Sequence, residues 1–93
     1  MTRNQKELLK LLGSEYSMKE IDMENCIYRK INDNYDIEIS NTYRKNKPID
    51  VYVWDISKGM TSNARIVESV CNIKSNLQLK NVVDDLAQKY SDL

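Results

Sequence analysis

The segment from residue 75 to residue 92 has the clearest hydrophobic pattern in the chain. Its apolar residues recur at intervals of three and four positions, the spacing of one face of an α-helix. The order Ser75-Asn76-Leu77-Gln78 is typical of a helix start. We therefore expect a long amphipathic helix that packs against an apolar surface. Its buried face would consist of Leu79, Val82, Val83, Leu86 and Tyr90.

A second, shorter helix is predicted at residues 3 to 12. Thr2 and Gln5 have the spacing of a capping box, in which each side chain accepts a hydrogen bond from the other residue's backbone. Four leucines follow between positions 8 and 12. Gly13 can adopt the positive φ that often ends a helix.

Alternation of apolar and polar residues predicts strands in the middle of the chain. Residues 35 to 40 alternate strictly, which is typical of a half-buried strand, and the turn-forming residues 32 to 34 precede them. Residues 50 to 56, DVYVWDI, are apolar on both faces and indicate a central strand. Polar loops are expected at 43 to 48 and 58 to 63.

A fourth strand is predicted at residues 65 to 73. Strict alternation divides it into two faces. One face would hold Val67, Ser69, Cys71 and Ile73, and the other Ile66, Glu68, Val70 and Asn72.

Residues 14 to 26 allow two interpretations. Ser17-Met18-Lys19-Glu20 has the form of a second capping box, which would begin a helix at 18 to 31. Alternatively, Ile27 and Ile31 belong to a strand at about 25 to 32, which forms a hairpin with the strand that follows. We favour the strand because of that hairpin.

Together these elements predict an α+β fold with the order α-β-β-β-β-α. Short connections favour a four-stranded antiparallel β-meander, with a short N-terminal and a longer C-terminal helix packed on one face. Ninety-three residues correspond to a single small globular domain, 1–93.

Composition restricts the class of protein. Apolar residues make up 41 % and charged residues 30 % of the chain, as in ordinary soluble domains. No apolar run is long enough for a membrane span or a secretory signal, so we expect a cytoplasmic protein without membrane contact. Fourteen basic and 14 acidic residues cancel, which makes nucleic acid a less favoured partner.

Residue types needed for common catalytic and cofactor sites are missing. The chain has no histidine, which excludes Ser–His and Cys–His pairs and imidazole ligands. Cys26 and Cys71 are 45 positions apart and form no metal or redox motif, so we expect two small side chains buried in strands; the alternatives are a disulfide and a reactive thiol. Two glycines cannot form a phosphate-binding loop. We expect no enzyme, no metal and no cofactor.

The strand at 50 to 56 provides the first candidate site, which consists of Tyr52, Trp54 and Ile56. If the helices cover Val51 and Val53, these three side chains lie on the uncovered face, together with Ile66 and Val70. Tyrosine and tryptophan bury a large area with few torsions to freeze, so they are frequent in protein interfaces. The alternative is that Trp54 belongs to the core beneath the C-terminal helix.

Charged groups offer two further candidates. Arg44, Lys45 and Lys47 form a basic cluster beside Tyr43, which suits backbone phosphates and base stacking, although a solvated loop is the simpler interpretation. Acidic strips at Asp33, Asp36 and Glu38, and at Asp84, Asp85 and Asp92, resemble the charge pattern of nucleic-acid mimics. They are short, and we expect ordinary solvated surfaces.

These observations favour a non-enzymatic protein-binding module that acts by occupying the surface of a partner. The bias towards Asn, Lys, Ile, Tyr and Asp is typical of AT-rich bacterial genomes and their phages. A phage or mobile-element inhibitor of a bacterial defence system such as CRISPR immunity would fit this origin. The alternatives are a small nucleic-acid-binding regulator that uses the loop from Tyr43 to Lys47, and a structural homodimer.

Overall fold

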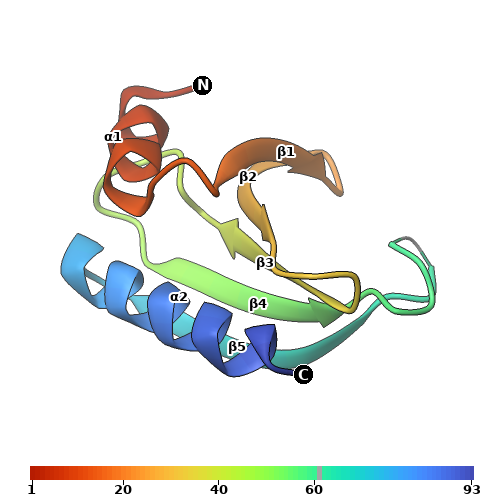
Figure 1. Ribbon diagram of the computed structural model, residues 1–93. Coiled ribbons are helices and arrows are strands. Elements are labelled where there is room, and N and C mark those ends of the chain that lie inside the picture. Colours follow the sequence, from red (N-terminus) through yellow and green to blue (C-terminus); the bar gives the residue numbers. More distant parts are fainter. Residues whose placement is uncertain (61) are drawn as a thin grey trace.

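The computed structural model describes residues 1–60 and 62–93, and it shows five strands between two helices (Figure 1). The predicted α+β class is confirmed, but the predicted number of strands, four, is wrong. The elements are α1 (Arg3–Leu12), β1 (Ser17–Ile21), β2 (Glu24–Lys30), β3 (Tyr35–Ser40), β4 (Ile49–Asp55), β5 (Arg65–Ile73) and α2 (Asn76–Ser91).

The five strands form one antiparallel meander in the order β1-β2-β3-β4-β5. The unpredicted strand, β1, pairs with β2 along its whole length, so the alternative helix at 18 to 31 is wrong. Asp22 and Met23 form the turn between them with φ of 50° and 67°. Both residues adopt the left-handed conformation that such tight hairpins require.

The two helices begin and end where their sequences predict. In α1, the Thr2 hydroxyl accepts a hydrogen bond from the Gln5 amide, and the Gln5 side chain accepts one from the Thr2 amide. Gly13 follows the helix with φ 104°. In α2, the Ser75 hydroxyl accepts a hydrogen bond from the Gln78 amide. These caps satisfy backbone amides that have no partner within the helix.

The helices and one face of the sheet form a single hydrophobic core. Figure 1 shows α2 lying along β4 and β5, with α1 near the end at which α2 begins. Val51 and Val53 are fully buried in this core, as expected for the face beneath the helices. The other core residues are Leu8, Leu12, Tyr16, Ile27, Ile37, Ile39, Ile49, Ile73, Leu79, Val83, Leu86, Ala87 and Tyr90.

Two irregularities in the pairing of β4 with β5 change the faces predicted for β5. Glu68 lies opposite Val53 and Val70 opposite Val51, so both share the helix-covered face with Ile73. Ile66 lies opposite Trp54 on the other face. The predicted grouping of Ile66 with Glu68 and Val70 is therefore wrong, because each bulge shifts the alternation by one residue.

Two further expectations concern the loop predicted at 58 to 63 and the absence of a membrane-spanning segment. Thr61, in the loop predicted at 58 to 63, lies outside the described residues. In the described part of the chain, neither helix combines the length and apolarity needed to cross a membrane.

Candidate binding site on the uncovered sheet face

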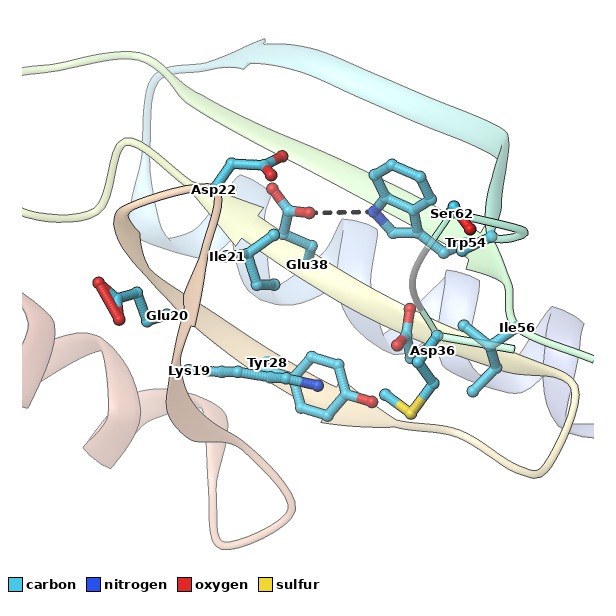
Figure 2. Close-up of a pocket in the computed structure, with 12 residues that line it drawn as sticks. Lys19, Glu20, Ile21, Asp22, Tyr28, Asp36, Glu38, Trp54, Ile56 and Ser62 are labelled. Carbon is cyan, nitrogen blue, oxygen red and sulfur yellow. Dashed lines mark hydrogen bonds between the residues drawn. The ribbon is translucent and has the colours of Figure 1, made fainter. Parts of the chain in front are cut away.

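The sheet face opposite the helices contains a cavity of about 480 Å³. Side chains of β2, β3 and β4 form its floor, and the β1–β2 hairpin and the segment after β4 form its walls (Figure 2). This volume is within the usual range for ligand sites. The described lining residues are Lys19, Glu20, Ile21, Asp22, Tyr28, Asp36, Glu38, Trp54, Ile56, Met60, Ser62 and Ala64.

The structure brings two of the three predicted binding residues to this cavity. Trp54 is partly buried and lines the cavity together with Ile56, which follows β4 and is only 6 % exposed. Tyr52 lies on the same face, opposite Glu38 of β3, but outside the cavity lining. The alternative placement of Trp54 beneath α2 is wrong, since its neighbours Val53 and Val51 occupy that core.

A hydrogen-bond network around Glu38 fixes the position of Trp54. The indole Nε1 of Trp54 donates to Glu38 Oε1 at 3.0 Å, as Figure 2 shows. The Ser40 hydroxyl donates to Glu38 Oε2 at 2.8 Å. Glu38 is 8 % exposed, so these donors replace the water that its carboxylate loses on folding.

The two cysteines occupy contrasting positions. Cys26 is 1 % exposed beside Glu38 and Ser40, and burial is the main cause that raises the pKa of its thiol to about 12. Such a thiol is a poor nucleophile at neutral pH. Cys71 is exposed on β5, so its expected burial is wrong.

Asp36 differs from Glu38 because the Tyr28 hydroxyl is the side-chain donor directed at its carboxylate, and no indole or second hydroxyl of a described residue joins it. The residue is 5 % exposed, and its side chain points into the cavity without forming an ion pair with the described residues (Figure 2). The buried hydroxyl of Tyr28 points towards this carboxylate and has no other hydrogen-bond partner among the described residues. Burial raises the pKa of Asp36, and the nearby Tyr28 hydroxyl and Lys19 ammonium only partly offset this effect.

Lys19 is the only cationic residue in the described lining of the cavity. Its Nζ lies 4.2 Å from the centre of the Tyr28 ring, in a cation–π contact. Asp36 and Glu38 face it from the floor, and Asp22 adds a third carboxylate from the hairpin, whereas the Glu20 side chain points away from the cavity (Figure 2). The cavity therefore has an acidic surplus although the whole chain has no net charge.

The expectation of solvated acidic strips is correct for the exposed residues on α2 and in the β2–β3 turn, but it is wrong for Asp36 and Glu38. Asp84 and Asp85 are exposed on α2, and the Asp33 side chain is 99 % exposed. Asp36 and Glu38 are instead buried, because the β1–β2 hairpin and the segment after β4 rise on either side of them. Strict alternation assigned them to the uncovered face, but it gave no sign of these walls.

The basic cluster lies outside the described lining of this cavity, in the loop between β3 and β4. The Arg44 guanidinium stacks over the Tyr43 ring at 5.7 Å, and Lys47 is exposed. Tyr43 and Lys45 line a second hollow beside the start of α1. The structure thus brings two of these four residues together around one hollow.

Neither metal ligands nor known proteins identify the site. In residues 1–60 and 62–93, no group of three or more Cys, Asp or Glu side chains is arranged to hold a metal ion. Comparisons with protein-family models, curated proteins and solved structures found no match. The proposals below therefore depend on the chemistry of the cavity itself.

Proposed function

We propose that this protein is a non-enzymatic binding module that docks on a partner protein through its uncovered sheet face and occupies the partner's surface. The observation that carries this proposal is the cavity between Trp54 and the β1–β2 hairpin, which the two helices leave open. Protein interfaces concentrate their binding energy in a few Trp, Tyr and Arg residues around a central pocket. Trp54 and the neighbouring Tyr52 provide such residues on a rigid strand.

Further features support binding over catalysis. The Cys26 thiol is buried, with a pKa raised to about 12, and Glu38 already accepts hydrogen bonds from Trp54 and Ser40. A nucleophile of the serine or cysteine type requires an activating base within hydrogen-bond reach. Ser62 is the only such residue in the described lining, and it donates no hydrogen bond to a described residue. Its aromatic, acidic and apolar surfaces suit recognition of another molecule.

Affinity capture from nuclease-treated bacterial lysate, followed by mass spectrometry, tests the proposal. The tagged wild-type protein should retain one stoichiometric protein, and the Tyr52→Ala/Trp54→Ala variant should lose it. A matched control is Leu11→Ala/Leu77→Ala, which removes exposed apolar side chains from the helices and should retain the partner. Thermal melts must show that both variants are folded, since Trp54 anchors Glu38.

Two results would contradict the proposal. Retention of the partner by the folded Tyr52→Ala/Trp54→Ala variant would place the interface elsewhere. Capture that occurs only when nuclease is omitted would indicate nucleic acid as the partner. Identification of a defence nuclease among captured proteins would support the narrower hypothesis of a phage or mobile-element inhibitor.

A nucleic-acid-binding regulator is the second candidate function. Lys45 and Tyr43 share a hollow with Arg3 of α1, which gives this end of the molecule a local basic surface. The Arg44 side chain already covers the Tyr43 ring, however, and Glu7 also lines the hollow. Binding to mixed DNA and RNA probes that falls steeply with salt, and that Lys45→Ala weakens, would support this function.

A further inference from the structure

The Asp36 carboxylate points to the chemical class of group that the cavity receives. The residue is only 5 % exposed, it forms no ion pair with the described residues, and the Tyr28 hydroxyl is the side-chain donor directed at its carboxylate. Buried carboxylates are normally paired or hydrogen-bonded, because removal from water is otherwise costly. The adjacent Tyr28 hydroxyl points at this carboxylate and can donate to one of its oxygens. One hydroxyl leaves most of the carboxylate's acceptor positions free, so the cavity can receive a further donor.

Charge and shape identify that donor as cationic and planar. In the described lining, the carboxylates of Asp22, Asp36 and Glu38 face the cavity against the single ammonium of Lys19. Asp36 and the Tyr28 hydroxyl oxygen offer separate acceptors, and the Trp54 indole adds an aromatic surface beside them. A guanidinium has five N–H donors in one plane and stacks on aromatic rings, whereas an ammonium is a compact, strongly hydrated charge. Arginine therefore matches this arrangement better than lysine.

The rim of the cavity indicates that the arginine belongs to a macromolecule. Met60 lines the opening and is 47 % exposed, and Met23, next to Asp22 at the tip of the β1–β2 hairpin, is 94 % exposed. Flexible, polarisable methionines are common at protein-binding surfaces. A free metabolite would not cover these side chains, but a protein segment that carries the arginine would.

We infer that the cavity accepts an arginine side chain of the partner protein, with its guanidinium against Asp36 and the Tyr28 hydroxyl and beside Trp54. This inference rests on the proposed function, because it names the group by which the partner is recognised. It also predicts which partners the uncovered sheet face selects: it should bind partner surfaces that are rich in arginine and not those that are neutral or acidic.

Titration with N-acetyl-L-arginine N-methylamide tests the chemistry of the cavity directly. Trp54 is the only tryptophan in the chain, so its indole N–H gives a single signal in a ¹H–¹⁵N spectrum. We expect a saturable shift with a Kd roughly in the millimolar range, as appropriate for one side chain. The neutral citrulline analogue, which has nearly the same shape, should bind at least about tenfold more weakly, and the lysine analogue several-fold more weakly.

Matched variants distinguish the cavity from general charge attraction. Asp36→Asn should reduce the arginine affinity at least about tenfold. Asp33→Asn removes the same charge from an exposed site and should leave it unchanged. The inference is wrong if arginine causes no saturable shift, if citrulline or lysine binds equally well, or if the two variants behave alike.

Capture of the partner separates this inference from the proposed function. If the wild-type protein retains a partner and Asp36→Asn does not, both are supported. A partner that depends on Tyr52 and Trp54 but is retained by Asp36→Asn would refute the arginine assignment and leave the binding module intact. If no variant, wild type included, retains a protein, the proposed function fails, whatever the titration shows.

Discussion

Replacement of Asp36 by asparagine should stabilise the fold, which is the opposite of the usual effect of changing a buried residue. Folding transfers this carboxylate from water to the cavity floor, where the Tyr28 hydroxyl is the side-chain donor directed at it. The cost of burying an ion in a protein is several kcal/mol. The Lys19 ammonium and the Tyr28 hydroxyl recover part of this cost. The neutral asparagine amide avoids the ionic part and keeps the size of the side chain.

The expected gain follows from these opposing contributions. Asparagine still buries a polar amide, which costs about 1–3 kcal/mol when unpaired. The net stabilisation at neutral pH should therefore be about 1–2 kcal/mol. For 93 residues the unfolding entropy is about 0.2 kcal/mol per degree, so the melting temperature should rise by about 5–10 °C.

The gain should depend on pH in a defined direction. Because burial raises the pKa of Asp36 in the folded state, ionisation of this group destabilises the fold. The wild-type protein is thus penalised above the folded-state pKa, and the penalty disappears below the unfolded-state value of 3.8. The difference between Asp36→Asn and wild type should be largest at neutral pH and vanish as the pH falls below that value.

Urea unfolding followed by Trp54 fluorescence measures this difference between about pH 7 and about pH 3.5. The control is Asp33→Asn, whose exposed ion pair with Lys30 should contribute less than about 1 kcal/mol. If Asp36→Asn is less stable than wild type at neutral pH, the carboxylate has favourable partners. The proposal that Asp36 binds an arginine side chain of the partner would then lose the observation on which it depends.

Three other changes test the fold and the network beneath the cavity. Leu86→Asp should unfold the domain, because Leu86 is 5 % exposed in the core and an unpaired charge there costs several kcal/mol; a native circular-dichroism melt would refute the placement of α2. Trp54→Phe should lower stability by about 1.5–3 kcal/mol in urea unfolding, because it removes the donor to the Glu38 carboxylate; an unchanged midpoint would mean that this bond contributes nothing. Glu68→Gln should flatten the acid limb of the stability profile. The Lys89 ammonium and the Tyr90 hydroxyl donate hydrogen bonds to Glu68 and lower its pKa. The stabilisation from this carboxylate is therefore present above its ordinary pKa of 4.5 and is lost as the pH falls below that value. An equal acid slope in variant and wild type would contradict this assignment.

Most of the fold could be predicted from local patterns, because most elements satisfy one rule along their whole length. The capping residues Thr2 and Ser75 mark the starts of both helices, and strict alternation marks β3. The strand β1 was not predicted, since SMKEI has little apolar character and only partial burial. Its turn also lacks the usual glycine and places Asp22 and Met23 at positive φ.

The candidate site could be predicted only in part. The face and residue type of Trp54 follow from the pattern of β4, whereas the cavity depends on how distant segments rise around it. Asp36 and Glu38 have the same alternation that a solvated strand would have. Their burial comes from Lys19 and its neighbours on the hairpin and from Met60 beyond β4, and no local pattern carries that information. Likewise, the bulges that place Glu68 on the helix-covered face depend on how β5 pairs with β4, and the sequence of β5 alone does not show this pairing.

The alternation in β3 also has a consequence for how the chain finds its native pairing. Ile37 and Ile39 lie in the core, and the buried carboxylates of Asp36 and Glu38 lie on the other face. A slip of β3 by one residue would turn both carboxylates towards the helices and both isoleucines away. Each misplaced ion would cost several kcal/mol, so misregistered sheets are strongly disfavoured. A chain with a neutral, apolar residue at position 36 would be more stable in the native register, but it would distinguish that register less sharply from its neighbours.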